Sequence, residues 1–352
     1  LKVAQLEDGA FRFFYVTNRQ PSDRQGPVEG RYEPTRETSL KFGSFDTIFE
    51  ASLGLGMIIN PSDWFLNEEI NLQAVRSLEQ EAFVSGLREQ VEASPYRSLL
   101  LVVHGFREAF PSALRKTAFL AHVLDIDTPV LVFDWPGNQG SSLRGYRRAR
   151  RVAQESGAEL ADTLRLIHRE VKPDRIWLMA NSMGGQVVAD AFSILYQDPE
   201  FANAQARIED VVLTAPDVDH DEFNSQFKDE IGALADNVTV YVSSNDRALL
   251  VSRVINRGLR LGESTLDPEN PVQVEETANL LELLEDGDEQ LALVDVTPVN
   301  RTRNFHNFSL ETPEFFDDLY LRFTGSGTTT RRVVYSLQTP NGSQYYVLTQ
   351  GR

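Results

Sequence analysis

The 352-residue chain has no cysteine and is short of basic residues. Without cysteine it cannot form a disulfide, a thiolate metal site or a cysteine nucleophile. Its 34 Lys and Arg residues are outnumbered by 52 Asp and Glu residues, which gives a net charge of -18. Nucleic acids and anionic membranes both favour basic surfaces, so neither is expected as a principal partner.

Long hydrophobic runs are also missing. The apolar stretch "ASLGLGMII" at 51–59 is too short to span a bilayer, and Asp46 and Glu50 precede it. No signal-like apolar run follows Leu1, although a presequence removed earlier would leave no trace. The expectation is a soluble protein, cytoplasmic or exported with a removed presequence. Composition does not predict its oligomeric state.

Short apolar runs without alternation recur from residue 97 onward, a pattern typical of strands buried on both faces. These runs are 98–105, 129–135, 175–180, 210–216, 237–244 and 291–297. Helical patterns lie between or after them, at 111–124, 146–171, 184–197, 221–235 and 247–259. Strand alternating with helix predicts an α/β fold, with a mostly parallel, doubly wound sheet and helices on both faces.

The predicted organisation is one main domain at 1–322 and a C-terminal β-hairpin extension at 323–352. The hairpin is indicated by two β-rich runs around "PNG". The main domain is expected to comprise an N-terminal strand and helical segment at 1–96, a catalytic core at 97–262 and 291–322, and an acidic insertion at 263–290. The strand is "FRFFYVTNR", a turn-rich stretch follows it, and a helical pattern covers 66–92. The insertion is either a lid or a solvated excursion.

The stretch "LMANSMGGQVV" at 178–188 carries the first candidate chemistry. A strand-like run stops at Ser182, and a helical pattern begins straight after it. In a nucleophile elbow the serine occupies a strained turn, so the residues two before and two after it must be small. Ala180 and Gly184 satisfy this requirement, although glycine is usual at the first position. Ser182 is therefore a candidate nucleophile, and its alternative role is a helix N-cap.

Two backbone N–H groups are candidates for an oxyanion hole. Met183 N–H lies at the start of the helix after Ser182, where free donors and the helix dipole favour negative charge. The motif "VVHGF" ends another strand, and the loop after this strand supplies the second donor in folds of this kind. We assign that donor to Phe106 N–H. Gly105 allows a close backbone approach, and His104 is interpreted as structural support.

A serine nucleophile needs a base and an orienting carboxylate. Of the five histidines, only His306 combines a loop after the last strand with a position late in the chain. The order serine, acid, histidine is typical of this architecture. Asp246 follows the strand that usually carries the acid, and Asp217 is the runner-up. The alternative role of Asp246 is a helix N-cap, because "RALLVSRVI" follows it.

Two further motifs contain clustered charged residues. "PDVDHDEF" combines three aspartates with a histidine, but nothing in its spacing requires converging ligands, so no metal is predicted. "LRGYRRARR" brings Arg144, Arg147, Arg148 and Arg151 near one helical face, either as a solvated surface or as a site for an anionic substrate group. No phosphate-binding loop or dinucleotide fingerprint is present, so no cofactor is expected.

Six motifs in order resemble the α/β-hydrolase family known as DUF900: "VVHGF", "VLVFDWPGNQG", "NSMGGQVV", "TAPDVDHDEF", "VTVYVSSNDRALLVS" and "FHNFSLETP". "FYVTNR" is similar to that family's opening strand, so the resemblance covers about 11–320. It implies an α/β-hydrolase fold with a Ser-Asp-His triad at Ser182, Asp246 and His306. Asn181 stands where relatives commonly have histidine, and Ala180 where glycine is typical. The resemblance implies no substrate.

The function predicted from these residues is a serine hydrolase of carboxylic esters with a small-molecule substrate, an acyl-enzyme intermediate and no cofactor. One alternative is an acyltransferase with the same triad, which added alcohol or amine acceptors would reveal. Another is a non-catalytic scaffold whose pocket or hairpin binds a partner. Neither the acyl chain length nor the choice between ester and amide can be read from the sequence.

Overall fold

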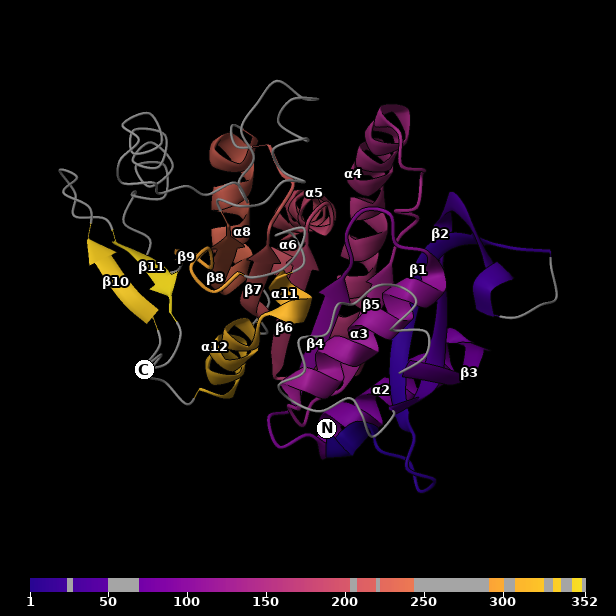
Figure 1. Cartoon of the computed structure of the whole chain (residues 1–352). Coiled ribbons are helices and arrows are strands. Elements are labelled where there is room, and N and C mark those ends of the chain that lie inside the picture. The colour runs from indigo at the N-terminus through magenta and orange to yellow at the C-terminus, as the bar shows by residue number, and fades with distance from the viewer. Residues whose placement is uncertain are drawn as a thin grey trace.

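The eleven strands of the described part of the chain form one mixed sheet in the order β10-β11-β9-β8-β7-β6-β4-β5-β1-β2-β3 (Figure 1). The structure is a computed structural model, and it describes residues 1–23, 28–49, 70–202, 208–219, 222–243, 291–300, 308–325, 332–336 and 344–349. The strands from β4 to β9, together with β1 beside β5, pair in parallel. The carboxyl ends of these strands therefore meet at one edge of the sheet, where ligands bind in open α/β sheets.

The central strands confirm the predicted pattern of unbroken apolar runs. Their bounds are β4 Ser98–Val103, β5 Val130–Asp134, β6 Arg175–Asn181, β7 Ile208–Thr214, β8 Ala235–Val242 and β9 Leu291–Asp295. Every residue of β4 and of β5 is buried. Since both faces of these strands are covered, neither face needs a polar side chain, and alternation disappears.

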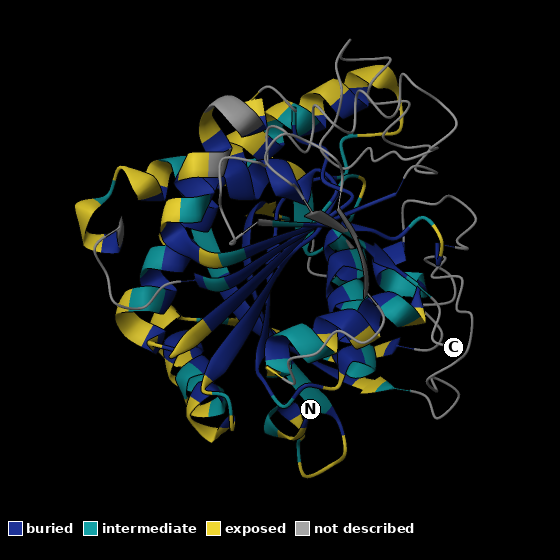
Figure 2. Ribbon diagram, turned by 90° about the vertical axis from the view of Figure 1, so that its left-hand side faces the viewer, coloured by how far each residue is buried: buried dark blue, intermediate teal, exposed yellow. Residues whose placement is uncertain are grey.

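Helices cover both faces of the sheet, and two separate apolar clusters fill the space between the layers. One cluster packs α2 (Gln80–Ala93), α4 (Leu143–Leu166), α5 (Gly184–Tyr196) and α8 (Lys228–Leu234) on one face. The other packs α3 (Phe110–Leu124), α11 (Phe308–Glu311) and α12 (Pro313–Thr324) on the opposite face. Figure 2 shows the dark, buried strands between these layers, with exposed residues on the outer helix faces.

Shorter helical turns complete the described elements. They are η1 Lys2–Ala4, η2 Val28–Gly30, η3 Ile167–Val171, α6 Pro199–Ala202 and η4 Phe223–Phe227. The predicted helix at 146–171 is thus α4 and η3 together, and the one at 221–235 is η4 and α8. The predicted helix at 247–259 and the acidic insertion at 263–290 lie outside the described residues.

The predicted helical segment before residue 96 is wrong in its first part. Residues Ile70–Leu78 form strand β3, and only α2 after it is helical. The predicted turn-rich stretch, residues 20–39, is also wrong in its second part, because 32–39 begin the long strand β2, Tyr32–Phe49, which lies between β1 (Phe11–Pro21) and β3. Leu72, Val75 and Leu78 have helix-like spacing, but pairing with β2 holds them extended. Because edge strands are half exposed, their sequences lack the apolar runs of the central strands.

The C-terminal β-rich runs are strands β10 (Arg332–Ser336) and β11 (Gln344–Leu348), which pair antiparallel. Strand β11 also pairs in parallel with β9, so the two strands extend the main sheet. Residues 337–343 lie outside the described residues, and the hairpin connection stays a prediction. The division at residue 322 into a domain and an extension likewise stays a prediction.

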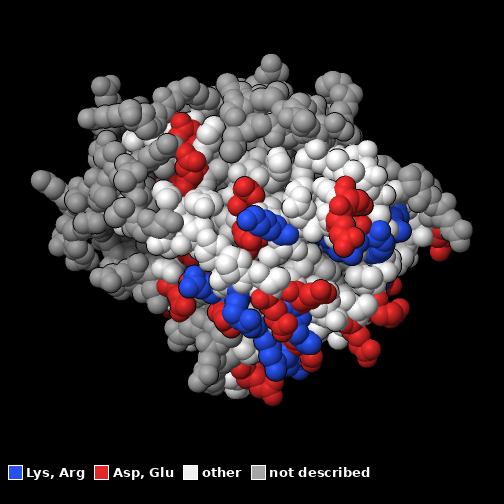
Figure 3. All heavy atoms as spheres, turned by 90° about the horizontal axis from the view of Figure 1, so that it is seen from below, with Lys and Arg blue, Asp and Glu red and all other residues white. Residues whose placement is uncertain are grey.

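The amino ends of the parallel strands carry charges of both signs. In Figure 3, which views the molecule from below, blue and red side chains lie interspersed. Arg97 pairs with Asp174 before β4, and Arg175 pairs with Glu209 at the starts of β6 and β7. Within the described residues, no helix has both the length and the apolar character that crossing a bilayer requires.

Helices α4 and α5 approach closely at Gly157. A Cβ added to Gly157 would lie 2.6 Å from Asp190 Cβ, so only glycine permits this contact. The close packing shields the Asp190 carboxyl from much of the surrounding water. Burial raises the pKa of Asp190 to about 6, and Gln186, which donates a 2.8 Å hydrogen bond to Oδ2, opposes the rise.

We predict that Asp190→Asn stabilises the protein at neutral pH but not at pH 4. The folded-state pKa lies above that of the unfolded chain, so wild-type stability falls as pH rises from about 4 to 6. Asparagine removes this loss and can still accept a hydrogen bond from Gln186. The gain at pH 7 should be about 1–2 kcal/mol in urea unfolding. A gain of equal size at pH 4 would contradict the titration of Asp190 as its cause.

Candidate active site

Ser182 has a left-handed backbone, with φ of +52°, between β6 and α5. This conformation costs a non-glycine residue about 1–3 kcal/mol, so its surroundings must hold it. Ser182 N–H donates to Thr214 O at 2.9 Å, and Ser182 O accepts from the N–H groups of Gly185 (2.9 Å) and Asp217 (3.1 Å). These bonds join the turn to the carboxyl end of β7. The geometry is that of the strand–turn–helix predicted for a nucleophile elbow.

The elbow packs directly against the end of β4. A Cβ added to Gly184 would lie 2.6 Å from His104 O and 2.7 Å from Val103 O. A Cβ at Gly105 would lie 3.0 Å from Ser182 Cβ and 3.0 Å from Asn181 Oδ1. Ala180 is fully buried, and the core accommodates its methyl group. The need for small residues, inferred from the sequence, thus has a concrete cause: two backbone segments nearly touch here.

The two predicted oxyanion donors lie on either side of this contact. Met183 is the N-cap residue of α5, and Phe106 follows Gly105 in the loop after β4. Neither Met183 N–H nor Phe106 N–H has a hydrogen-bond partner within the part of the chain that the structure describes. Free donors at a helix N-terminus and in the adjoining loop can stabilise a developing negative charge.

Tyr146 connects the loop of Phe106 to the runner-up acid. Its ring packs edge-on against Phe106, with 5.7 Å between centroids. Its hydroxyl donates a 2.6 Å hydrogen bond to Asp217 Oδ2. Asp217 is buried, and its own N–H donates to Ser182 O. The Asp217 carboxylate is therefore close to the elbow but already accepts a hydrogen bond from helix α4.

Three of the five histidines are held away from a role as base. The buried His104 ring lies with Nδ1 2.9 Å from Gly105 O and Nε2 3.1 Å from Asp134 Oδ1, so both nitrogens are engaged. His122 stacks on Phe49, and His168, which lies in η3, contacts Phe201 in α6. His104 therefore has the supporting role expected of it. His220 and His306 lie outside the described residues.

Asp246 also lies outside the described residues, but hydrogen bonds hold residues shortly before Asp246 and on either side of His306. Ser243, at the end of β8, is fully buried and accepts a 2.9 Å hydrogen bond from Asn300 Nδ2. Asn181 Nδ2 donates to Thr214 Oγ1 (3.0 Å) and to Ser309 Oγ (3.2 Å). Asn181 thus ties the elbow to the start of α11, three residues beyond His306.

The remaining candidate ligand groups are the acidic motif after β7 and the arginines of α4. Within the described ranges, no three His, Cys, Asp or Glu side chains gather as metal ligands. Two members of "PDVDHDEF", His220 and Asp221, lie beyond those ranges, so the absence of a metal stays a prediction. Arg144, Arg147, Arg148 and Arg151 are all exposed, whereas Tyr146 on the same turns is buried. Their recognition of an anionic substrate group also stays a prediction.

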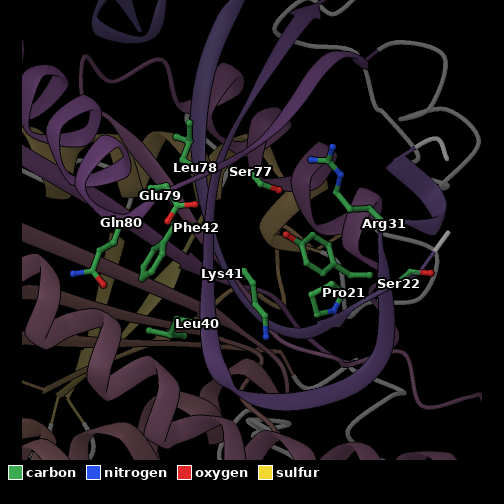
Figure 4. A pocket seen from close by; sticks show the side chains of 11 residues that line it. Pro21, Ser22, Arg31, Leu40, Lys41, Phe42, Ser77, Leu78, Glu79 and Gln80 are labelled. Atoms are coloured by element: carbon green, nitrogen blue, oxygen red, sulfur yellow. The ribbon is translucent and has the colours of Figure 1, made fainter. Parts of the chain in front are cut away.

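A cavity of about 790 Å³ lies elsewhere, between the end of β1, strands β2 and β3, and the start of α2 (Figure 4). None of its lining residues is a predicted site residue. Strands β4, β5 and β1 separate β6 from β2 in the sheet. In Figure 4, Phe42 and Gln80 lie on one side of β2 and Arg31 on the other, so the lining groups do not converge. This cavity therefore offers no acyl-transfer chemistry.

Sequence reasoning missed several residues beside the elbow. Tyr146 and Ser309 contact site residues from α4 and α11, and Arg19 forms a buried ion pair with Asp134 next to His104. One signal for Arg19 was available: an arginine that ends the apolar strand "FRFFYVTNR" has little reason to be there unless it is paired. Tyr146 stands among arginines, and nothing local distinguishes it.

We predict that Gly184→Ala destabilises the fold by about 1–3 kcal/mol, because a methyl group must displace the backbone carbonyls of Val103 and His104. Urea unfolding monitored by circular dichroism would measure the loss. Gly30→Ala is the matched control, since a Cβ at Gly30 meets nothing within 4 Å. Equal stability of the two variants would contradict the close packing of the elbow on β4.

Comparisons with known proteins find solved structures at low identity and one family. Among solved structures, an inhibited esterase B from Lactobacillus rhamnosis is similar at 12% identity and a TM-score of 0.36, over 65% of this chain and 78% of that one. The native Est2 esterase of Thermogutta terrifontis is similar at 13% identity and a TM-score of 0.35, over 66% and 84%. No curated protein matches.

The family model described as "Alpha/beta hydrolase of unknown function (DUF900)" matches residues 79–316, which include the elbow, the loop after β4 and the start of α12. This is more than half of the chain, and it contains all six motifs on which the resemblance was based. The mostly parallel sheet, with helices on both faces and a strained serine between strand and helix, is the fold that the family description names. The chain belongs to the DUF900 family of α/β hydrolases.

Proposed function

We propose that the chain hydrolyses carboxylic esters, with Ser182 as nucleophile, His306 as general base and Asp246 as the orienting carboxylate. The observation that carries this proposal is the left-handed backbone at Ser182, directly before a helix whose N-cap N–H, that of Met183, has no partner within the described residues. A serine that only capped a helix would ordinarily have an extended backbone and would not need the strained turn. Strain of this kind persists where function requires it.

The spacing of the anchored residues supports His306 and Asp246 as partners of Ser182. Strand β8 is two positions from β6 in the sheet, a distance of about 10 Å. Asp246 is three residues beyond Ser243, and His306 is three residues before Ser309. Three residues of extended chain span about 10 Å, so both side chains can reach the elbow. His104, the histidine nearest to Ser182 in the described part, is occupied by Asp134 and Gly105 O.

The proposed reaction proceeds through an acyl-enzyme. Ser182 Oγ attacks the ester carbonyl carbon while His306 takes the Ser182 proton, and Asp246 stabilises the imidazolium. Met183 and Phe106 N–H groups bind the oxyanion. As the C–O bond to the alcohol breaks, His306 returns the proton to the leaving oxygen. Water then attacks the acyl carbon, His306 accepts its proton, and the proton passes to Ser182 as the acid is released.

Esters are favoured over amides as substrates because an alkoxide is a better leaving group than an amide nitrogen. The departure of an alkoxide depends less on exact protonation by His306 than the departure of an amine does. The partly buried Phe106 ring and the buried Tyr146 ring stand beside the proposed oxyanion site. These aromatic groups suit an uncharged acyl or alkyl portion of the substrate.

We predict that Ser182→Ala lowers kcat for p-nitrophenyl esters by roughly 10⁴-fold or more with the fold intact. Mass spectrometry after treatment with a fluorophosphonate should find one adduct on the wild type and none on the variant. Ser309→Ala is a useful control, because Ser309 is buried beside the elbow without being the proposed nucleophile. A labelled, active Ser182→Ala protein would exclude the assignment, and an unlabelled, inactive wild type would exclude the function.

We predict that Asp246→Asn reduces kcat about 10⁴-fold, while Asp217→Asn reduces it less than about 10-fold. The reason is that Tyr146 already donates to Asp217, which makes that carboxylate a supporting group of the elbow. Steady-state kinetics with one p-nitrophenyl ester would measure both. The reverse ranking would assign the orienting carboxylate to Asp217.

A further inference from the structure

We propose that Arg19 is a positioning residue for the oxyanion donor Phe106, acting by holding together the loops that follow β4 and β5. The inference rests on the proposed ester hydrolysis. Arg19 lies on β1, outside the elbow and outside the predicted triad. Within the described residues, no hydrogen bond joins it to Ser182 or Phe106. Its action is on the backbone that carries Phe106.

The Arg19 guanidinium binds four groups at once, and its residue is 1% exposed. Nε and Nη2 donate to the two oxygens of Asp134 at 2.7 and 3.0 Å. Nη2 also donates to Glu108 O (2.9 Å) and Trp135 O (2.7 Å), and Nη1 donates to Asn138 Oδ1 (2.6 Å). Glu108 belongs to the loop after β4, and the other acceptors belong to the end of β5 and its loop. One side chain therefore bridges both loops.

Asp134 completes the bridge to the oxyanion loop. It is fully buried and also accepts from Thr17 Oγ1 (2.6 Å), while His104 Nε2 lies 3.1 Å from its Oδ1. Burial alone would raise the pKa of Asp134, but Arg19 and His104 hold it below the ordinary value. The carboxylate is thus charged and paired. Since His104 directly precedes Gly105, the Arg19–Asp134 pair reaches within two residues of Phe106.

Two further hydrogen bonds, one from the backbone and one from a side chain, join the two loops. Arg107 N–H donates to Gly137 O at 3.0 Å from a left-handed backbone with φ of +70°. Trp135 Nε1 donates to His104 O at 2.8 Å. Phe106, between His104 and Arg107, is therefore held on both sides. On its far side the loop meets the elbow at Gly105.

Stability alone does not account for a buried ion pair of this kind. Apolar residues of similar volume often replace such a pair without loss of stability, whereas removing one partner leaves an unpaired buried charge. Apolar residues cannot hold the Glu108 and Trp135 carbonyls, however. A fixed geometry at the oxyanion donor is what the guanidinium adds, and small misplacements of such donors are costly in rate.

The test is the double variant Arg19→Met/Asp134→Leu, which removes both charges together. The matched control is Arg12→Met/Asp46→Leu, a part-buried pair between strands β1 and β2 (Arg12 Nε–Asp46 Oδ1 2.8 Å) that is not connected to either loop. A second variant, Arg19→Lys, keeps the charge but loses the planar fork that reaches several acceptors at once. Hydrolysis of p-nitrophenyl butyrate, thermal unfolding and amide hydrogen exchange are measured for all three.

The double variant should lose about 10- to 100-fold in kcat with KM changed less than about 3-fold. Affinity for a trifluoromethyl ketone, which forms a tetrahedral oxyanion on Ser182, should fall by the same factor as kcat/KM. Affinity for the corresponding methyl ketone should stay unchanged. Amide hydrogen exchange should become faster in the peptide that covers 104–109 and stay slow in the peptide that covers β6. Arg19→Lys should show the same pattern to a smaller degree, and the control none of it.

Unchanged kcat and unchanged exchange at 104–109 in a folded double variant would overturn the proposal. Equal loss of affinity for both ketones with a collapsed melting temperature would also overturn it, because a general structural role would then suffice. If the double variant does not fold, the same measurements of kcat, ketone affinity and exchange at 104–109 on Arg19→Lys test the proposal. The exchange measurement does not depend on activity. A wild type that hydrolyses no ester would reject the proposed function. Faster exchange at 104–109 in the double variant would still show that Arg19 holds the loop that carries Phe106.

Discussion

The close contact between the carboxyl ends of β4 and β6 is the constraint on which the site depends. Gly184 lies against the carbonyls of Val103 and His104, and Gly105 lies against Ser182. Because the two segments nearly touch, the chain after β6 must turn sharply, and Ser182 takes a left-handed backbone. The same contact brings the loop after β4 beside the first turn of α5. The proposed nucleophile and the two proposed oxyanion donors thus depend on one packing requirement.

Strand β1 connects the N-terminal part of the chain to this edge. It pairs in parallel with β5, and Thr17 lies in register with Asp134. Two residues further on, Arg19 reaches both loops beside the elbow from the end of the strand. Within the described residues Arg19 is the one buried arginine, and it is paired next to the proposed site. The antiparallel strands β2 and β3 then extend the sheet away from it.

The parts predicted well are those whose signals are local. The central strands are unbroken apolar runs because both of their faces are covered, and the elbow needs small residues within two positions of Ser182. The parts missed depend on distant partners. Residues 70–78 have helix-like spacing but are a strand because β2 pairs with them. Arg19 and Asp134 are 115 positions apart, and no local pattern links them.

The sequence by itself determined the alternation of strand and helix in the central sheet and the position of the strained serine. These features follow from short-range periodicity and from which residues tolerate a tight turn. The tertiary structure alone decided that Tyr146 binds Asp217, that Asn181 binds Ser309, and that Arg19 joins two loops. Each of these contacts joins segments that only the folded sheet brings to one edge. Hydrogen bonds between such segments leave no periodic trace in the chain.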